Sequence, residues 1–76
     1  MEEALILVVT SPSFDFDSLP KIKKILGVQD ANLIYGAYDM FVKIKTESMN
    51  EVRSAVLSLR ETPGIKSTLT CNVINE

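Results

Sequence analysis

The residues with the clearest chemical potential in this chain lie in one stretch, Tyr35-Gly36-Ala37-Tyr38-Asp39. The carboxylate of Asp39 can accept hydrogen bonds from an ammonium group, and exposed amides at Gly36 and Ala37 can donate to a carboxylate. Gly36 adopts positive φ at little cost, which allows a tight turn there. These groups together could hold a small polar ligand if an apolar wall lies beside them. The same residue types are also common in turns without any ligand, because an Asp side chain hydrogen-bonds nearby backbone amides.

The other chemically capable side chains are few. Thr68 and Thr70 are two residues apart, and their hydroxyls can add hydrogen bonds to a ligand. Cys71 is the single cysteine and the chain has no histidine, so we interpret it as a small buried hydrophobic residue rather than an activated nucleophile. The same composition excludes an intrachain disulfide and a metal cluster of the Cys/His type. We therefore expect no cofactor and no metal.

Length and charge limit the kind of protein that this chain can be. Its 76 residues predict one domain, and a chain of this length buries only about 60% of its unfolded-state surface. With so thin a core, oligomerisation is the expected supplement. The formal charge of −2 disfavours nucleic-acid binding, which depends on clustered Lys and Arg. No apolar run approaches the ~20 residues that cross a bilayer, and the acids Glu2 and Glu3 disfavour a secretory signal. We expect a cytoplasmic protein without a membrane partner.

The first third of the chain predicts a strand followed by a helix. Ala4–Thr10 is a continuous apolar run, which is typical of a central strand covered on both faces. A helix begins after Asp17 or Ser18, with Pro20 in its first turn, and ends at Gly27. The stripe that this helix buries contains Leu19, Ile22, Ile25 and Leu26.

The rest of the chain predicts a hairpin, a helix and a final strand. Ala31–Ile34 and Met40–Lys45 flank the glycine-containing stretch, and the second of them alternates apolar and polar residues as a strand does. Ser48-Met49-Asn50-Glu51 matches a capping box, and Pro63-Gly64 ends the helix that follows it. Residues alternate again in Ile65–Ile74. On its more apolar side we place Ile65, Ser67, Leu69, Cys71 and Val73, and on the other side Lys66, Thr68, Thr70 and Asn72.

The order strand, helix, strand, strand, helix, strand predicts an α+β fold, the ferredoxin-like βαββαβ unit. Right-handed crossovers then place both helices on one face of a four-stranded antiparallel sheet with the spatial order 4-1-3-2. The other face is left open, and an open, half-apolar face on so small a domain calls for a partner, most simply a second copy. The residues expected on the open face are Phe41, Lys43, Lys45, Thr68 and Thr70.

Four short motifs, taken together, resemble a known family. Tyr35–Asp39, Val42-Lys43-Ile44, Pro63-Gly64-Ile65 and Ser67-Thr68-Leu69-Thr70 occur in the order and spacing of the effector-binding domain of Lrp/AsnC regulators. This is also called the RAM domain (regulation of amino-acid metabolism). The resemblance covers nearly the whole chain and is strongest over 32–74. Family members usually carry an N-terminal helix-turn-helix DNA-binding domain. Because the first strand starts so close to Met1, we expect residues 1–76 to be a single RAM domain without one.

The resemblance implies both assembly and ligand. Family members form dimeric α+β barrels through their sheet faces, assemble into tetramers, octamers or larger rings, and hold amino-acid effectors in crevices between dimers. Gly36 and Asp39 match the family's Gly-x-x-Asp hairpin, and Thr68 and Thr70 match its Thr-x-Thr strand nearby. Tyr35 departs from the threonine that often precedes the glycine. The resemblance therefore implies a ligand-sensing and oligomerisation module that can also join full-length Lrp/AsnC regulators, with Tyr35–Asp39, Thr68 and Thr70 as its ligand-binding residues.

Two other functions fit the same fold. Small dimeric α+β-barrel enzymes of the monooxygenase or isomerase type enclose a reactive cavity between sheets, but they commonly use histidine, a metal or a haem. In this chain Asp15 and Asp17 lie in a loop and Asp39 stands alone, so we expect no enzyme. RNA-recognition modules stack bases on aromatic residues of the two central strands. Phe41 is the one such aromatic here, which disfavours that function.

Overall fold

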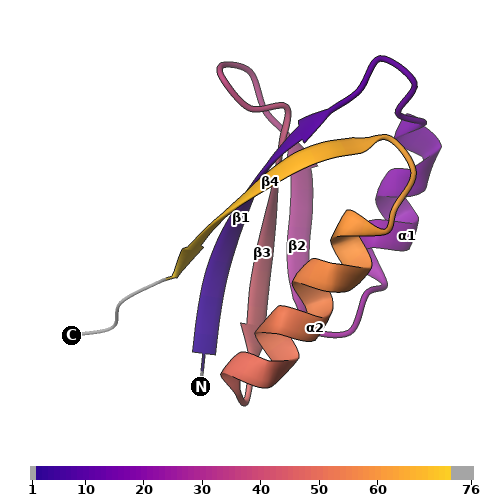
Figure 1. The fold of residues 1–76 in the computed structure, drawn as a ribbon. Coiled ribbons are helices and arrows are strands. Elements are labelled where there is room, and N and C mark those ends of the chain that lie inside the picture. Colours follow the sequence, from indigo (N-terminus) through magenta and orange to yellow (C-terminus); the bar gives the residue numbers. More distant parts are fainter. Residues whose placement is uncertain (1, 73–76) are drawn as a thin grey trace.

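The computed structural model describes residues 2–72 and contains the predicted four-stranded antiparallel sheet with its two α-helices (Figure 1). The sheet order is β2-β3-β1-β4, which confirms the predicted order 4-1-3-2 and the ferredoxin-like fold. Along the chain the elements are β1 (Glu2–Thr10), a 3₁₀ turn η1 (Phe16–Ser18), α1 (Leu19–Lys23), β2 (Val28–Leu33), β3 (Met40–Thr46), α2 (Met49–Arg60) and β4 (Ile65–Asn72).

The core lies between the helices and one face of the sheet. In β1 the side chains of Ala4, Ile6 and Val8 are buried, whereas the residues between them are only half-buried, as the period of two requires. Strand β1 is central in the sheet, and its buried residues pack under the helices, whereas Leu5, Leu7 and Val9 lie on the face away from them. The predicted cover on the second face is therefore not present within the described residues of one protomer. The remaining buried core side chains come from Phe14, Ile22, Ala31, Met40, Val42, Ile44, Val52, Ala55 and Leu59.

The two helices differ in how well the sequence predicts them. In α2 the Ser48 Oγ accepts a hydrogen bond from the Glu51 amide at 3.3 Å, and Glu51 Oε2 accepts one from the Glu47 amide at 3.4 Å. These bonds satisfy amides at the start of the helix. Helix α1 is shorter than expected and ends at Lys23, because the chain then turns toward Gly27, which has a φ of 95°. Leu26 is consequently 89% exposed, and its predicted place on the buried stripe is wrong.

The predicted face assignment of β4 is wrong beyond its first residue. Val9 pairs with Ser67 and Thr10 pairs with Ile65, so Lys66 is an extra residue in a β-bulge. The bulge reverses the alternation that a regular strand would keep. Thr68 and Thr70 pair with Val8 and Ile6 and therefore face the helices, as Asn72 does opposite Ala4, while Leu69 and Cys71 face away from them. Val73, assigned to the same side as Cys71, lies outside the described residues.

The sheet face away from the helices is predominantly apolar along its middle. Leu5, Leu7 and Val9 of β1 are half-buried, and Phe41 lies opposite Leu7 in the register. Leu69 is 47% exposed, and Cys71 is exposed rather than buried as predicted. Glu3 and Lys45 form an ion pair at 3.5 Å toward one end of this face. We call Leu5, Leu7, Val9, Phe41, Leu69 and Cys71 the open face. No helix among the described residues is long and apolar enough to span a bilayer.

Candidate functional site

The loop between β2 and β3 is fastened to the end of β1. Its two ends are joined by a hydrogen bond from the Ile34 amide to the Asp39 carbonyl oxygen at 3.0 Å. The Asp39 amide in turn donates to the Val8 carbonyl oxygen at 2.8 Å. Gly36 stands at the tip with a φ of 128°, which favours glycine. The loop projects beyond the ends of β2 and β3 (Figure 1), and the hydrogen bonds at its base hold its two ends in place.

Asp39 is held by the last residue of β1. Its Oδ2 atom accepts a hydrogen bond from the Thr10 amide at 2.8 Å and another from Thr10 Oγ1 at 3.3 Å. The first of these hydrogen bonds gives the Thr10 N–H an acceptor at the end of the strand, where the sheet no longer provides one. The other carboxylate oxygen, Oδ1, has no hydrogen-bond partner among the described residues. One oxygen therefore serves the fold, and the other remains available to a ligand.

Apolar side chains build a crevice of about 340 Å³ beside this carboxylate. We call it the Asp39 crevice, and it is lined by Thr10, Phe16, Leu33, Ile34, Tyr35 and Asp39. Phe16 is 60% exposed, yet its position is fixed because its ring packs edge-on against buried Phe14, with 5.4 Å between ring centroids. Tyr35 is fully exposed and Leu33 is 44% exposed. The crevice thus combines one carboxylate with a wall of apolar surface open to solvent.

The structure brings together only part of the predicted ligand-binding set. Tyr35 and Asp39 line the crevice, and Gly36, Ala37 and Tyr38 belong to the same loop without lining it. Thr68 and Thr70 line a different hollow, between α2 and β4, which shares no residue with the Asp39 crevice. Within one protomer, therefore, the two predicted halves of the site are separate.

Sequence reasoning missed four residues of the crevice, namely Thr10, Phe16, Leu33 and Ile34. The place of Thr10 beside Asp39 could have been predicted from the strand order. Because β1 lies beside β3 and Val8 pairs with Met40, the end of β1 must run next to the residue that precedes β3. Phe16 had no such signal, since its place depends on a 3₁₀ turn whose start is capped by the Asp15 side chain, which accepts from the Asp17 amide at 2.9 Å.

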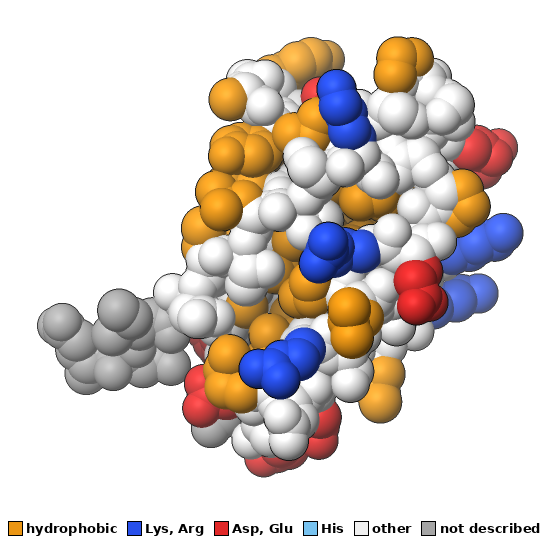
Figure 2. Space-filling view, viewed as in Figure 1, with side chains coloured by type: hydrophobic (Ala, Val, Ile, Leu, Met, Phe, Trp, Pro, Cys, Tyr) orange, Lys and Arg blue, Asp and Glu red, His pale blue; other side chains and the backbone are white. Residues whose placement is uncertain are grey.

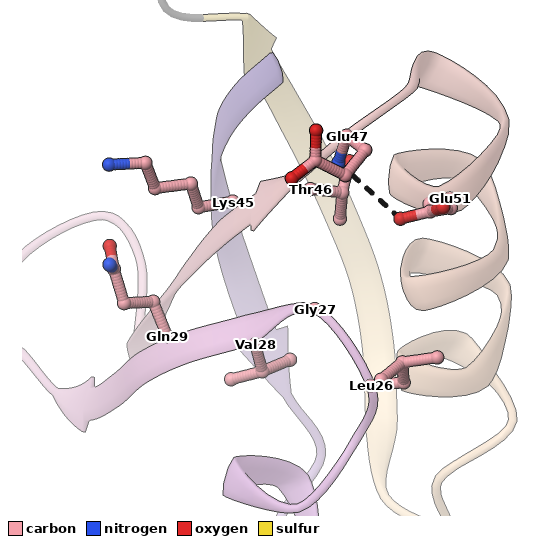
Figure 3. A pocket seen from close by; sticks show the side chains of 8 residues that line it. All are labelled: Leu26, Gly27, Val28, Gln29, Lys45, Thr46, Glu47 and Glu51. Carbon is pink, nitrogen blue, oxygen red and sulfur yellow. Dashed lines mark hydrogen bonds between the residues drawn. The ribbon is translucent and has the colours of Figure 1, made fainter. Parts of the chain in front are cut away.

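Another hollow, about 770 Å³, lies around Gly27 and the start of α2 (Figure 3). In Figure 3 the side chains of Lys45 and Gln29 lie on the opposite side of this hollow from Leu26 and Glu51. Its carboxylate Glu51 already caps the Glu47 amide, and Lys45 already pairs with Glu3. Because these groups point apart and already have partners within the fold, we regard this hollow as an irregularity of the surface rather than a binding site. Within residues 2–72 no cluster of three metal-ligating side chains occurs.

Comparison with known proteins identifies the family of this domain. The family model described as the Lrp/AsnC ligand binding domain matches residues 4–76. The chain is also 35% identical over 75 residues to homocitrate synthase of Saccharolobus solfataricus. That match covers 97% of this chain but only 16% of the enzyme's length.

Solved structures agree with the fold. The crystal structure of FFRP-DM1 has a TM-score of 0.86 and 29% identity, over 97% of this chain and all of the other. A transcriptional regulator from Neisseria meningitidis, solved in complex with L-methionine, has a TM-score of 0.81 and 21% identity. This second match covers 99% of this chain and 51% of the regulator. At that identity the likeness shows a shared fold.

Proposed function

The chain belongs to the Lrp/AsnC ligand binding domain family, and we propose that it is a sensing and oligomerisation module that binds a free amino acid in the Asp39 crevice. The observation that carries the proposal is the divided role of the Asp39 carboxylate. Its Oδ2 is held by Thr10, which fixes the direction of the group, while Oδ1 has no partner among the described residues. A carboxylate held in this way is preorganised to accept a hydrogen bond from an ammonium group.

The surroundings of Asp39 supply the other needs of an amino acid. Leu33, Ile34 and Phe16 offer an apolar wall for a side chain. The amides of Gly36 and Ala37 do not line the crevice but lie in the adjoining loop, and we propose them as donors for the carboxylate. The crevice is open to solvent, and a second copy would complete it, in keeping with the crevices between dimers that the family implies. The L-methionine complex of the Neisseria meningitidis regulator supports an amino acid as the kind of ligand.

We further propose that the smallest stable unit is a homodimer formed through the open face, from which tetramers, octamers or rings can be built. A face that exposes Leu69 and half-exposes Phe41 and Leu7 is costly to leave in water on a domain of this size. Assembly with full-length Lrp/AsnC regulators through the same face would transmit the ligand signal, most simply in the cytoplasm. The similarity to part of homocitrate synthase makes a metabolic enzyme a second candidate partner.

Catalysis by the chain itself is not part of the proposal. The crevice offers a single carboxylate, and the chain contains no histidine that could act as a base beside it. A dimeric α+β-barrel enzyme would need a reactive group that none of the crevice residues provides.

Substitution of Asp39 tests ligand binding. Asp39→Asn keeps an oxygen for the Thr10 amide but removes the negative charge, so amino-acid affinity should fall roughly ten- to a hundredfold in a protein that stays folded. The measurement is calorimetric titration of both proteins with a panel of amino acids, beside their thermal midpoints. Unchanged affinity in the folded variant removes Asp39 from the site, and absence of binding by the unmodified protein ends the sensing role.

Assembly is tested separately by sedimentation. Phe41→Asp places a charge on the open face and should shift the protein toward monomer at low micromolar concentration. Leu57→Asp is the matched control, because Leu57 is 52% exposed on α2, on the other side of the molecule. A folded monomer in the unmodified protein, or equal effects of the two substitutions, would argue against this dimer.

A further inference from the structure

A groove runs between α2 and β4 on the helix-bearing face. Helix α2 buries Val52, Ala55 and Leu59 over the central strands, and edge strand β4 extends beyond its cover. Two hollows of about 420 and 210 Å³ lie along this line. Both are lined by Val56 and Thr70, so the two hollows adjoin, and we call them together the α2–β4 groove. Its floor is hydroxyl-bearing because the β-bulge turns Thr68 and Thr70 toward the helices.

The charged side chains that line the groove are all cations. Arg53 lines one hollow, Arg60 and Lys66 line the other, and neither hollow is lined by an Asp or Glu. The ion pair within residues 2–72 joins Lys45 to Glu3, so it involves none of these three cations. In Figure 2, blue Lys and Arg side chains lie along this face, whereas most red side chains lie toward the margins of the view. A chain of net charge −2 thus gathers cations at one place.

The spacing of these cations defines the shape of an acceptable ligand. Arg53 and Arg60 are two helical turns apart on one stripe of α2, about 10.5 Å along the axis. Long arginine side chains can lean inward from these positions, and Thr70 lies between the two hollows. The groove therefore has a positive end, a hydrogen-bonding middle and a second positive end. An elongated molecule with a negative group at each end matches that order.

We propose that the α2–β4 groove is a second ligand site, for a small dicarboxylate. Arg53 receives one carboxylate and Arg60 with Lys66 receives the other, while Thr68 and Thr70 donate hydrogen bonds from the floor. Guanidinium groups suit this role because their paired N–H donors match the two oxygens of a carboxylate. The site is independent of the Asp39 crevice, which is apolar and carries a negative charge, so the two would respond to different metabolites.

Titration calorimetry of the full chain at low salt tests the proposal with glutarate as probe. Glutarate should bind saturably, and butyrate, which has one carboxylate, should bind at least about tenfold more weakly. Arg53→Gln and Arg60→Gln should each lower glutarate affinity by about tenfold or more. Lys21→Gln is the matched control, since Lys21 is an exposed cation of α1 outside the groove, and it should leave the affinity unchanged. Amide shifts of Thr68 and Thr70 in NMR spectra should follow the same titration.

Three results would overturn the dicarboxylate site. The first is the absence of saturable glutarate binding. The second is an equal loss in Lys21→Gln, which would mean general charge screening. The third is binding of inorganic phosphate as tight as that of glutarate, which would assign the groove to phosphorylated ligands. Asp39→Asn should keep glutarate affinity while losing amino-acid affinity, so failure of one site leaves the test of the other intact.

Discussion

The Asp39 crevice and the α2–β4 groove use charge in opposite ways. In the crevice the single carboxylate is hydrogen-bonded to the amide and hydroxyl of Thr10, so the charge is part of the junction between β1 and the β2–β3 loop. In the groove Arg53, Arg60 and Lys66 have no ion-pair partner among the described residues. A charged group that hydrogen-bonds the backbone stabilises the fold whether or not a ligand is bound. An unpaired charge on the surface makes no such contribution to the free energy of unfolding.

This difference arises from where each region lies in the sheet. Asp39 precedes β3 next to central β1, where a strand-end amide would otherwise lack a protein partner. The groove borders edge strand β4, whose outer residues lie beyond the packing of α2. Substitutions in the crevice should therefore change stability and binding together, and substitutions in the groove should change binding with little effect on stability.

The largest loss of stability is expected from substitution of Gly64, which lies next to elements of both the Asp39 crevice and the α2–β4 groove. Its φ is 89°, and a Cβ added there would lie 2.6 Å from Phe14 Cα, a backbone atom that cannot easily move. Phe14 in turn supports Phe16 in the Asp39 crevice, while Gly64 leads directly into β4 beside the groove. Gly64→Ala should lower the free energy of unfolding by about 2–4 kcal/mol through strain and overpacking, measured by urea denaturation.

Gly36→Ala is the matched control for Gly64→Ala. Gly36 also has a positive φ, 128°, but no atom lies within 4 Å of an added Cβ. Only backbone strain remains, which costs about 1–3 kcal/mol at most and less if the exposed loop relaxes. If Gly36→Ala were the more destabilising of the two, contact with Phe14 would not be what fixes Gly64.

Removal of the Asp39 carboxylate gives the next largest effect. Asp39→Ala leaves the Thr10 amide and hydroxyl without their acceptor and should cost about 1–2 kcal/mol, because water can replace part of the loss at this exposed position. Asp39→Asn retains an acceptor oxygen and should cost less than about 0.5 kcal/mol. Thermal and urea unfolding of the two variants give the comparison. Equal stability of Asp39→Ala and the unmodified protein would mean that Thr10 does not hold the carboxylate in solution.

Much of the fold could be predicted because its signals are local. The apolar run of β1, the Ser48–Glu51 capping box and the alternation of β3 each fix one element, and handedness then fixes the strand order. The face of β4 could not be predicted in the same way. A single bulge at Lys66 reverses the alternation, and nothing within β4 distinguishes a bulged register from a regular one.

The candidate sites were likewise predictable only where their residues lie close together in the sequence. The β2–β3 loop was found because a glycine and an aspartate near each other in sequence have recognisable turn chemistry. The partner of Asp39 is Thr10, 29 residues away, and it becomes visible only through strand pairing. The α2–β4 groove was not predicted, because its cations belong to two elements and Thr68 and Thr70 had been assigned to the opposite face.

The smallest changes in the free energy of unfolding are expected for Arg53→Gln and Arg60→Gln, which test whether the groove cations are unpaired. Arg53 is the fifth residue of α2, beyond the first turn in which the helix dipole acts on a charge, and it has no ion-pair partner within residues 2–72. Arg53→Gln should therefore leave the free energy of unfolding unchanged to within about 0.5 kcal/mol at low salt. Arg60 lies in the last turn, where the dipole favours a cation, so the same substitution there should cost about 0.3–1 kcal/mol. The loss at Arg60 should shrink in 1 M salt, where the Debye length falls to about 3 Å. Urea denaturation of the two variants measures the contrast: no loss of stability is expected for Arg53→Gln and a small loss for Arg60→Gln. A loss above about 1 kcal/mol in Arg53→Gln that persists in high salt would mean that Arg53 packs or pairs within the fold, and the contrast with Asp39 would then fail.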